Sequence, residues 1–360
     1  MTPAQLRCFD ELLSIGGARP TTPPGLVDAI KKVLDDGTRG AIEAWTERSL
    51  WFGKAQLSTM LGCEGNVVAS RLETRERRVT PAIATGQITH RAIQLSHTHG
   101  GRNVDEYVRL ALAGCMAEET FVEFWEECEI QTQSDCLVQS ASRLCSFLDT
   151  FPTLDPSWTP RFEESIQAKV GRLTLAARPD LVLGRPRADG RQTMFLCDFK
   201  SGELREDHEL EARYYALVST LRNGCAPYRS TVLSLASGEW THPDVSGEEL
   251  IELAHVVANA VVRQVEVLTE QREPVLSAGM HCTWCPAKAT CEAHTEWRAA
   301  GSKEPAVIDW LSIGGVSLPQ KTEAVVRPAE IQVEAKKPRT TKAKTSVSVP
   351  AAAEEDPFAI

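Results

Sequence analysis

Two short apolar segments joined by a polar turn occupy residues 178–203, RPDLVLGRPRADGRQTMFLCDFKSGE. The turn contains Asp-Gly, a pair favoured in β-hairpins, so the segments are predicted to be neighbouring antiparallel strands. Because strand side chains alternate between faces, Asp198 and Lys200 share one face while Phe199 points to the other. Asp180, from the partner strand, can approach the same patch. The hairpin therefore predicts two carboxylates and an ammonium group that converge at one end of the strands.

Such a patch has the composition of a hydrolytic metal site. Mg²⁺ is usually held by one or two carboxylates together with phosphate oxygens and waters. A metal bound there can activate water for attack on a phosphodiester, and a lysine can orient that water or stabilise the negative charge of the transition state. The same residues also fit a surface hairpin with a salt bridge, because short motifs recur by chance. Other parts of the chain must decide between the two interpretations.

Helices and strands alternate around this hairpin. Helical patterning covers residues 1–50, broken by the prolines of RPTTPPG, and continues to about residue 150. Strands are predicted over 169–184, 192–202 and 228–238, and helices over 205–224 and 247–273. This order places the chain in the α/β class.

The bulk composition is that of a globular protein. The chain has 360 residues, a net charge of −10 and 42% hydrophobic residues. An acidic total argues against a generally basic nucleic-acid-binding surface but leaves room for a local basic groove. No apolar run is long enough to span a bilayer, and the first residues lack the pattern of a secretory signal. We therefore expect a cytoplasmic protein with no membrane partner.

Three of the eleven cysteines are clustered in 282-CTWCPAKATC-291. Without an export signal, the cysteines are predicted to be reduced thiols, metal ligands or both, rather than disulfides. Three thiolates at this spacing form a soft-metal site that lacks one ligand. Zinc would take a fourth cysteine or a histidine, such as His281 or His294, and a four-iron–four-sulfur cluster would take a fourth cysteine. Spacing alone leaves both open.

The motifs of the central region resemble those of the PD-(D/E)XK nucleases. RPD at Asp180, followed by DFK at Asp198 and Lys200, is similar to the signature that gives that superfamily its name. LEARYYAL is similar to a Gln-x-x-x-Tyr motif of its RecB-like branch, with Glu211 in place of the glutamine. Tyr215 lies four residues later, on the same helical face.

Further motifs upstream and downstream resemble the RecB-like branch that carries an iron–sulfur cluster, as in AddB-type nuclease domains and CRISPR-associated RecB-like exonucleases. GQITHRAI, with Gly86 and His90, is similar to its Gly-x-x-x-His element. QLSTMLGCEG, with Ser58 and Cys63, is similar to its Ser-x-x-x-x-Cys opening. His97 is a rival to His90, as is His99, but neither has a glycine four residues before it. The resemblance covers residues from about 55 to 295.

That resemblance implies a division of the chain into three parts. A restriction-endonuclease-like nuclease domain, an α/β core with a mixed central sheet flanked by helices, would occupy residues 51–295 and carry a cysteine-ligated cluster. An N-terminal helical region would precede it over residues 1–50. A linker and a disordered low-complexity tail, basic first and acidic last, would follow over residues 296–360.

The resemblance also assigns roles to the site residues. The ligands implied for a catalytic Mg²⁺ or Mn²⁺ are His90, Asp180, Asp198 and the backbone carbonyl of Phe199. Lys200 would be the catalytic lysine, and Tyr215 would organise the site or contact the substrate strand. Position 211 would do the same, but Glu211 replaces the usual glutamine, so its role is open.

For the cysteines, the resemblance implies a four-iron–four-sulfur cluster, with zinc as the alternative. The implied ligands are Cys63, Cys282, Cys285 and Cys291. A cluster that joins Cys63 to Cys282 would close a loop of about 219 residues, and closing so long a loop removes much of the entropy of the unfolded chain. We therefore expect a structural role for the cluster rather than electron transfer.

The implied function is that of a metal-dependent DNA nuclease, most simply an exonuclease acting on single-stranded DNA or DNA ends. A non-catalytic DNA-binding or assembly subunit and a zinc-stapled interaction module are the alternatives, and the retention of Asp180, Asp198 and Lys200 favours activity. No helicase-type phosphate loop is present in the sequence. Unwinding would therefore come from a helicase or a recombination or replication protein, which the tail could contact.

Overall fold

The computed structural model describes residues 1–14, 16–72, 79–98, 101–205, 207–243 and 245–302. The predicted tail from residue 303 onward lies outside the described residues, as does His99. Over the described ranges, no helix has both the length and the apolar character that crossing a bilayer requires.

Helices make up most of the first 150 residues. In chain order they are α1 (Pro3–Cys8), the π-helical turn η1 (Phe9–Leu13), α2 (Leu26–Ala44), α3 (Lys54–Gly62), α4 (Glu64–Leu72), α5 (Pro81–Thr98), α6 (Val104–Cys115), α7 (Glu119–Glu127) and α8 (Ile130–Thr150). The helix predicted to continue towards residue 50 ends at Ala44, and β1 (Leu50–Gly53) follows it.

The other strands lie between residues 161 and 241. They are β2 (Arg161–Phe162), β3 (Ile166–Val170), β4 (Leu173–Ala177), β5 (Leu181–Leu183), β6 (Phe195–Lys200), β7 (Arg229–Ser234) and β8 (Trp240–Thr241). The remaining elements are η2 (Pro156–Trp158), α9 (Asp207–Asn223), α10 (Gly247–Leu268), η3 (Met280–Trp284), η4 (Pro286–Ala289) and α11 (Glu292–Ala299). Both helices predicted after the hairpin are confirmed, and α9 ends at Asn223, directly before Gly224, whose φ of +74° lies in the left-handed region.

The strands form two sheets. The larger has the order β2-β5-β6-β7-β8, and the smaller has the order β1-β4-β3. Strands β5 and β6 are antiparallel, with Leu181 opposite Cys197, which confirms the predicted hairpin. Strands β6 and β7 are parallel, as are β1 and β4. The chain therefore has a mixed α/β fold in which sheets are flanked by helices.

The single strand predicted over residues 169–184 is wrong, because two residues interrupt it. Gly171, with a φ of +57°, forms the turn between β3 and β4. Pro179 lies between β4 and β5 and lacks the N–H group that a continuous ladder needs. Strand β4 therefore pairs in the smaller sheet and β5 in the larger one. Asp180 lies where the chain passes between them.

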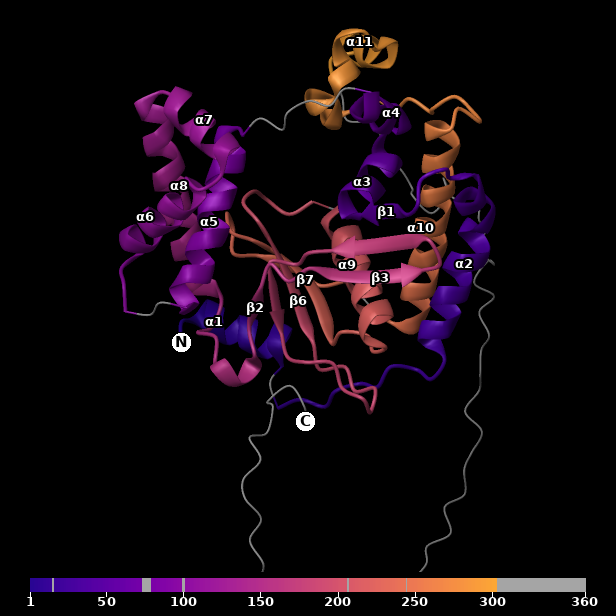
Figure 1. The fold of residues 1–360 in the computed structure, drawn as a ribbon. Helices are drawn as coiled ribbons and strands as arrows, with labels where there is room; N and C mark the ends of the chain where they lie inside the picture. Colours follow the sequence, from indigo (N-terminus) through magenta and orange to yellow (C-terminus); the bar gives the residue numbers. More distant parts are fainter. Residues whose placement is uncertain (15, 73–78, 99–100, 206, 244, 303–360) are drawn as a thin grey trace, which may run out of the picture.

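Helices cover both faces of the larger sheet (Figure 1). Cys197 and Phe199 of β6 belong to the hydrophobic core formed with α5, α6, α7 and α8. Leu196 belongs to the other core, which is built largely from α2, α9, α10 and the smaller sheet. This division confirms the predicted alternation along β6, and it leaves Asp198 and Lys200 on the side of α9.

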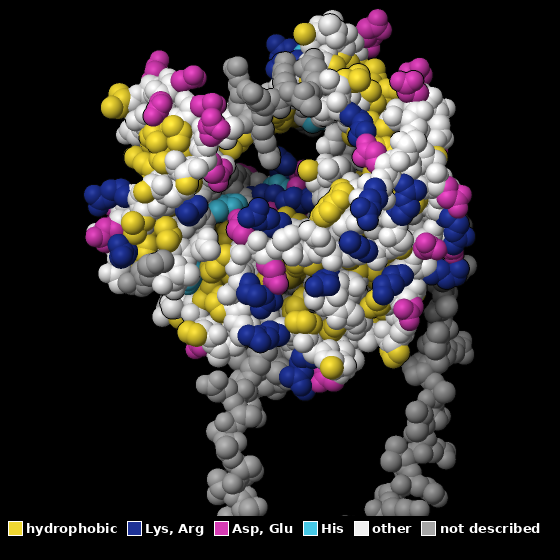
Figure 2. Space-filling model, in the orientation of Figure 1, with side chains coloured by type: hydrophobic (Ala, Val, Ile, Leu, Met, Phe, Trp, Pro, Cys, Tyr) yellow, Lys and Arg dark blue, Asp and Glu magenta, His cyan; other side chains and the backbone are white. Residues whose placement is uncertain are grey.

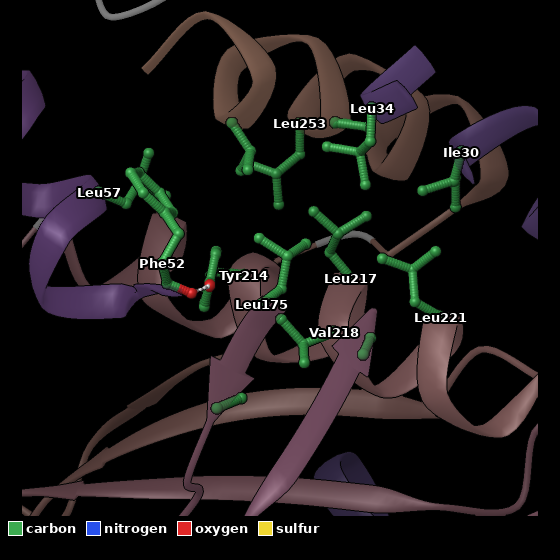
Figure 3. Close-up of a cluster of buried hydrophobic side chains, with 14 of the residues drawn as sticks. Ile30, Leu34, Phe52, Leu57, Leu175, Tyr214, Leu217, Val218, Leu221 and Leu253 are labelled. Carbon is green, nitrogen blue, oxygen red and sulfur yellow. Dashed lines mark hydrogen bonds between the residues drawn. The ribbon is translucent and has the colours of Figure 1, made fainter. Parts of the chain in front are cut away.

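Helix α9 packs between the sheets and the outer helices α2 and α10 (Figure 3). Leu217 and Leu221 reach the core that also contains Ile30 of α2. The fully buried Tyr214 donates a hydrogen bond of 2.7 Å to the carbonyl of Phe52 in β1. This bond fixes α9 to the smaller sheet. The side chain of the next residue, Tyr215, reaches β6 instead.

Candidate active site and cysteine module

The charged end of β6 lies against α9 and the start of α3. Asp198, only 4% exposed, accepts a hydrogen bond of 2.8 Å from the hydroxyl of Tyr215. Its other carboxylate oxygen lies 2.8 Å from the ammonium of Lys200. A second ammonium group, that of Lys54, approaches the same oxygen at 3.4 Å. The predicted association of Asp198, Lys200 and Tyr215 is present, and Lys54 is an addition that the sequence motifs did not indicate.

Glu211, on α9, completes a network of four charges. One of its carboxylate oxygens lies 2.6 Å from the ammonium of Lys200 and 3.1 Å from that of Lys54. With Asp198, two carboxylates face two ammonium groups, and the network is neutral. A glutamine at position 211 would leave one positive charge in excess. The presence of Lys54 therefore gives a physical reason for the glutamate. We call these four residues the charge network.

Attraction between its members sets the ionisation of the charge network. Burial on its own would raise the pKa of Asp198, but Lys54 and Lys200 hold it below its usual value. Burial would lower the pKa of Lys200, whereas the carboxylates of Asp198 and Glu211 raise it. Burial also raises the pKa of Tyr215, so its hydroxyl remains a hydrogen-bond donor. Asp198 and Lys200 therefore stay ionised at neutral pH.

Three further side chains converge beside the start of β5. His90, on α5, has its Nδ1 3.0 Å from Oδ1 of Asp180 and 3.7 Å from Oε1 of Glu163. One ligand atom from each of the three lies within 4.8 Å of the other two. The backbone N–H of Phe199 donates to the second carboxylate oxygen of Asp180 and so fixes its orientation. We call His90, Glu163 and Asp180 the metal group.

The donor atoms of the metal group suit a divalent cation. Adjacent ligands at about 2.1 Å from an octahedral Mg²⁺ lie about 3 Å apart, and His90 and Asp180 have this separation. Burial would lower the pKa of His90, but Asp180 and Glu163 outweigh it and raise the pKa to about 10. The carboxylates that attract a proton to the imidazole would also attract a divalent cation.

Of the predicted metal ligands, His90 and Asp180 belong to the metal group, and Asp198 adjoins it. Continuing the β5–β6 register places Asp198 opposite Asp180. Burial, reinforced by the charge of Asp198 and opposed by that of His90, raises the pKa of Asp180 to about 6. The rival His97 stacks on Phe162 instead, with 5.7 Å between ring centroids, and burial lowers its pKa to about 4.

Glu163 is the member of the metal group that the motifs did not predict. It follows β2 with a φ of +52°, a backbone region that few residues other than glycine adopt. Its N–H donates to the carbonyl of Asp180 at 3.1 Å, and its carboxylate pairs with Arg178 at 2.9 Å. The sequence signal was weak, since Glu163 is one of two adjacent acids far from the recognised motifs.

The molecule is hollowed between the helical group that contains α5 and the part that carries α3 and α4 (Figure 2). Histidine side chains and lysine or arginine side chains lie at the walls of this hollow. On α5, Gly86 lies one turn before His90, and a Cβ atom added to it would meet no other atom within 4 Å. Packing against neighbouring atoms therefore does not require glycine at this position.

All four predicted cysteine ligands line one cavity of about 50 Å³, together with His281 and His294. Cys63 directly follows α3, and the other three surround η3 and η4. Burial alone would raise the pKa of Cys63, but hydrogen bonds from His281 and the backbone lower it, which favours the thiolate that binds metals. We call Cys63 and residues 276–294 the cysteine module.

Glu64 attaches this module to the core. Its carboxylate, 1% exposed, pairs with Arg263 of α10 at 2.6 Å and with Arg272 at 2.7 Å. The N–H of Val275 donates to the same carboxylate at 2.7 Å. Burial opposes ionisation of Glu64, but the bonds from Arg272, Val275 and Arg263 lower its pKa to about 2. This contact fixes the segment that leads from α10 to the cysteines.

Comparison with known protein families identifies a match. The model of the PD-(D/E)XK nuclease superfamily matches residues 55–292, about two thirds of the chain. The matched range contains the metal group and all four cysteines of the cysteine module, and it begins one residue after Lys54. Among curated proteins, none matches this chain.

Replacing Glu163 by glutamine should weaken the binding of divalent cations, because the neutral amide removes negative charge beside His90 and Asp180. We expect the affinity for Mn²⁺, measured by isothermal titration calorimetry, to fall by about 10- to 100-fold. Glu164→Gln is the matched control, since that carboxylate pairs with Arg161 at 2.8 Å outside the metal group. Parental affinity in the Glu163 variant would exclude Glu163 from the metal site.

Replacing Glu64 by glutamine should destabilise the protein at neutral pH, because Arg263 and Arg272 lose their shared carboxylate. The folded-state pKa of Glu64 is about 2, below the unfolded value, so its contribution is complete above about pH 4.5 and is lost as the pH falls towards 2. We expect the free energy of unfolding at pH 7 to fall by about 2–3 kcal/mol. Urea unfolding of parent and variant between pH 3 and pH 7 measures this difference.

Glu266→Gln provides the control for this measurement. Glu266 also pairs with Arg272, but its side chain is 34% exposed, so the loss should be below about 1 kcal/mol. A difference between the Glu64 variant and the parent that grows as the solution is acidified would contradict the assignment.

Proposed function

Because the chain belongs to the PD-(D/E)XK nuclease superfamily, we propose that it is a Mg²⁺- or Mn²⁺-dependent deoxyribonuclease that degrades single-stranded DNA or DNA ends as an exonuclease. The observation that carries this proposal is the position of the metal group beside the charge network. The two meet where β5 begins and β6 ends, through Asp180 and Asp198. Ligands for a cation and a fixed ammonium group are thus adjacent, as phosphodiester hydrolysis requires.

The residues of the metal group would hold the cation, with Asp198 and the carbonyl of Phe199 as further ligands. When bound, the cation supplies an acidified water and polarises the scissile phosphate. Asp180 would be a rigid ligand, because the N–H of Phe199 fixes its carboxylate. His90 would be a ligand as the neutral imidazole, so binding of the cation would release its proton.

Lys200 would stabilise the negative charge that develops on the phosphate in the transition state. Asp198 and Glu211 hold its ammonium group at 2.8 and 2.6 Å, so it is already oriented before substrate binds. Such preorganised charge needs no rearrangement during the reaction. Tyr215 would keep Asp198 oriented towards the metal side, and Lys54 would balance the charge of Glu211.

For the cysteine module, we propose a structural four-iron–four-sulfur cluster. The proposal rests on the resemblance of the cysteine motifs and on the single cavity that all four cysteines line. The proposed helicase, recombination or replication partner rests on the sequence alone.

Lys200→Ala should abolish most of the nuclease activity, because the transition state loses its nearest fixed positive charge. With labelled single-stranded and duplex DNA and either Mg²⁺ or Mn²⁺, we expect the rate to fall by about 10²- to 10³-fold. Lys31→Ala, which changes an exposed lysine of α2, should leave the rate at the parental value.

Circular and linear single-stranded DNA separate the two modes of cleavage in the same assay. An exonuclease degrades the linear form alone, so loss of the circle would contradict that part of the proposal. If the Lys200 variant and the parent degraded DNA equally, the proposed site would be wrong. If the parent bound DNA without cutting it, a non-catalytic DNA-binding subunit would be the better description.

The parent protein, purified without oxygen, should be brown and absorb blue light if the cysteine module holds an iron–sulfur cluster. Cys63→Ser should reduce both iron content and absorbance, because it removes one of four ligands. Cys145→Ser, at an exposed cysteine of α8, should change neither. A colourless parent containing one zinc ion would instead establish the zinc alternative.

A further inference from the structure

Two adjoining hollows lie beside β3 and the end of α9. The first has a volume of about 780 Å³ and is lined by residues from the 154–166 segment, the 185–186 turn and the end of α9. The second has a volume of about 590 Å³ and is lined by β3 and the end of α9. Ser165 and Arg222 belong to both. Together they form a continuous depression, which we call the basic track.

Unpaired positive charge distinguishes the basic track. Lys169, Arg185 and Arg222 line it, and all three are exposed. Over the described ranges, none of these three cations has a carboxylate within ion-pair distance, whereas Arg161 is paired with Glu164. In the view of Figures 1 and 2, lysine and arginine side chains also gather over the surface formed by β3 and its neighbours. On a chain with a net charge of −10, such a surface is suited to an anionic polymer.

The basic track begins next to the metal group. Glu163 belongs to the metal group, whereas the next two residues, Glu164 and Ser165, line the first hollow. Beyond them, side chains of β3 alternate, so Ser165, Gln167 and Lys169 form an exposed row along one face. From Ser165 to Lys169 the extended chain covers about 13 Å. At about 3.4 Å per nucleotide in stacked DNA, this equals about four nucleotides of one strand.

We propose that the basic track binds the backbone of a single nucleic-acid strand whose scissile phosphate lies at the metal group. The proposal rests on the proposed function and extends it to the part of the substrate several nucleotides from the cleavage point. Lys169, Arg185 and Arg222 would contact phosphates, which take most protein–nucleic acid hydrogen bonds. Ser165 and Gln167 offer further hydrogen bonds without selecting a sequence.

A structural role would account for part of the track. Strand β3 is an edge strand of the smaller sheet, and lysine on an edge strand discourages pairing with other chains. Arg185 and Arg222 lie outside that strand, so edge protection explains neither of them. It would also predict that loss of Lys169 causes aggregation without a change in DNA affinity.

The test is the salt dependence of DNA binding by a triple variant, Lys169→Ala with Arg185→Ala and Arg222→Ala. Fluorescence anisotropy with a labelled dT20 oligonucleotide in EDTA measures binding while hydrolysis is blocked. Each phosphate contact on a single strand contributes about 0.7 to the slope of log affinity against log salt concentration. We expect the slope to become shallower by about 2 and the affinity at 0.1 M salt to fall by about tenfold or more.

A second triple variant, Lys31→Ala with Arg48→Ala and Arg109→Ala, removes the same charge from exposed positions outside the track. It should keep the parental slope. An unchanged slope in the first variant, an equal loss in the control, or no binding by the parent at low salt would overturn the proposal. If the parent cuts DNA and the first variant binds DNA as tightly as the parent, the nuclease proposal stands and the basic-track proposal is wrong. If the parent does not cut DNA but the first variant shows the expected loss of affinity, the basic-track proposal stands and the nuclease proposal is wrong.

Discussion

The site depends on one backbone N–H group that receives a side-chain acceptor in place of a strand partner. Strand β5 begins at Leu181, opposite Cys197, so its ladder with β6 stops before it reaches Phe199. The buried N–H of Phe199 needs an acceptor, because an unsatisfied one costs about 1–3 kcal/mol. The carboxylate of Asp180 accepts it. That bond leaves the other oxygen of Asp180 facing His90, so a requirement of folding also orients a member of the metal group.

Balance of charge explains the composition of the charge network. Two lysines reach the end of β6 from different directions, Lys200 along the strand and Lys54 from the first turn of α3. One aspartate could neutralise one of them. Glu211 neutralises the other, and Tyr215 fixes Asp198 from the same helix. The difference at position 211 from the related motif is thus coupled to a residue 157 positions earlier in the chain.

Sequence reasoning predicted the parts of this structure that are encoded locally. The hairpin followed from Asp-Gly and strand alternation, and α9 followed from its apolar spacing and Gly224. Family resemblance added the partners of Asp198 and the distant Cys63, which reaches the same cavity as the later cysteines. Glu163 and Lys54 could not be predicted, because their positions depend on how β2 and β1 enter the two sheets. The division of the predicted strand at Pro179 could not be predicted for the same reason, since a long apolar segment can pair within one sheet or be shared between two.

Helix α3 connects the two chemical centres of the molecule. Lys54 is its first residue and Cys63 directly follows its last, so at 1.5 Å per residue they are about 14 Å apart along a stiff rod. A rod anchored at both ends transmits displacement. A displacement of Cys63 would therefore move Lys54 relative to Asp198 and Glu211, so the geometry of the charge network is mechanically linked to that of the cysteine module.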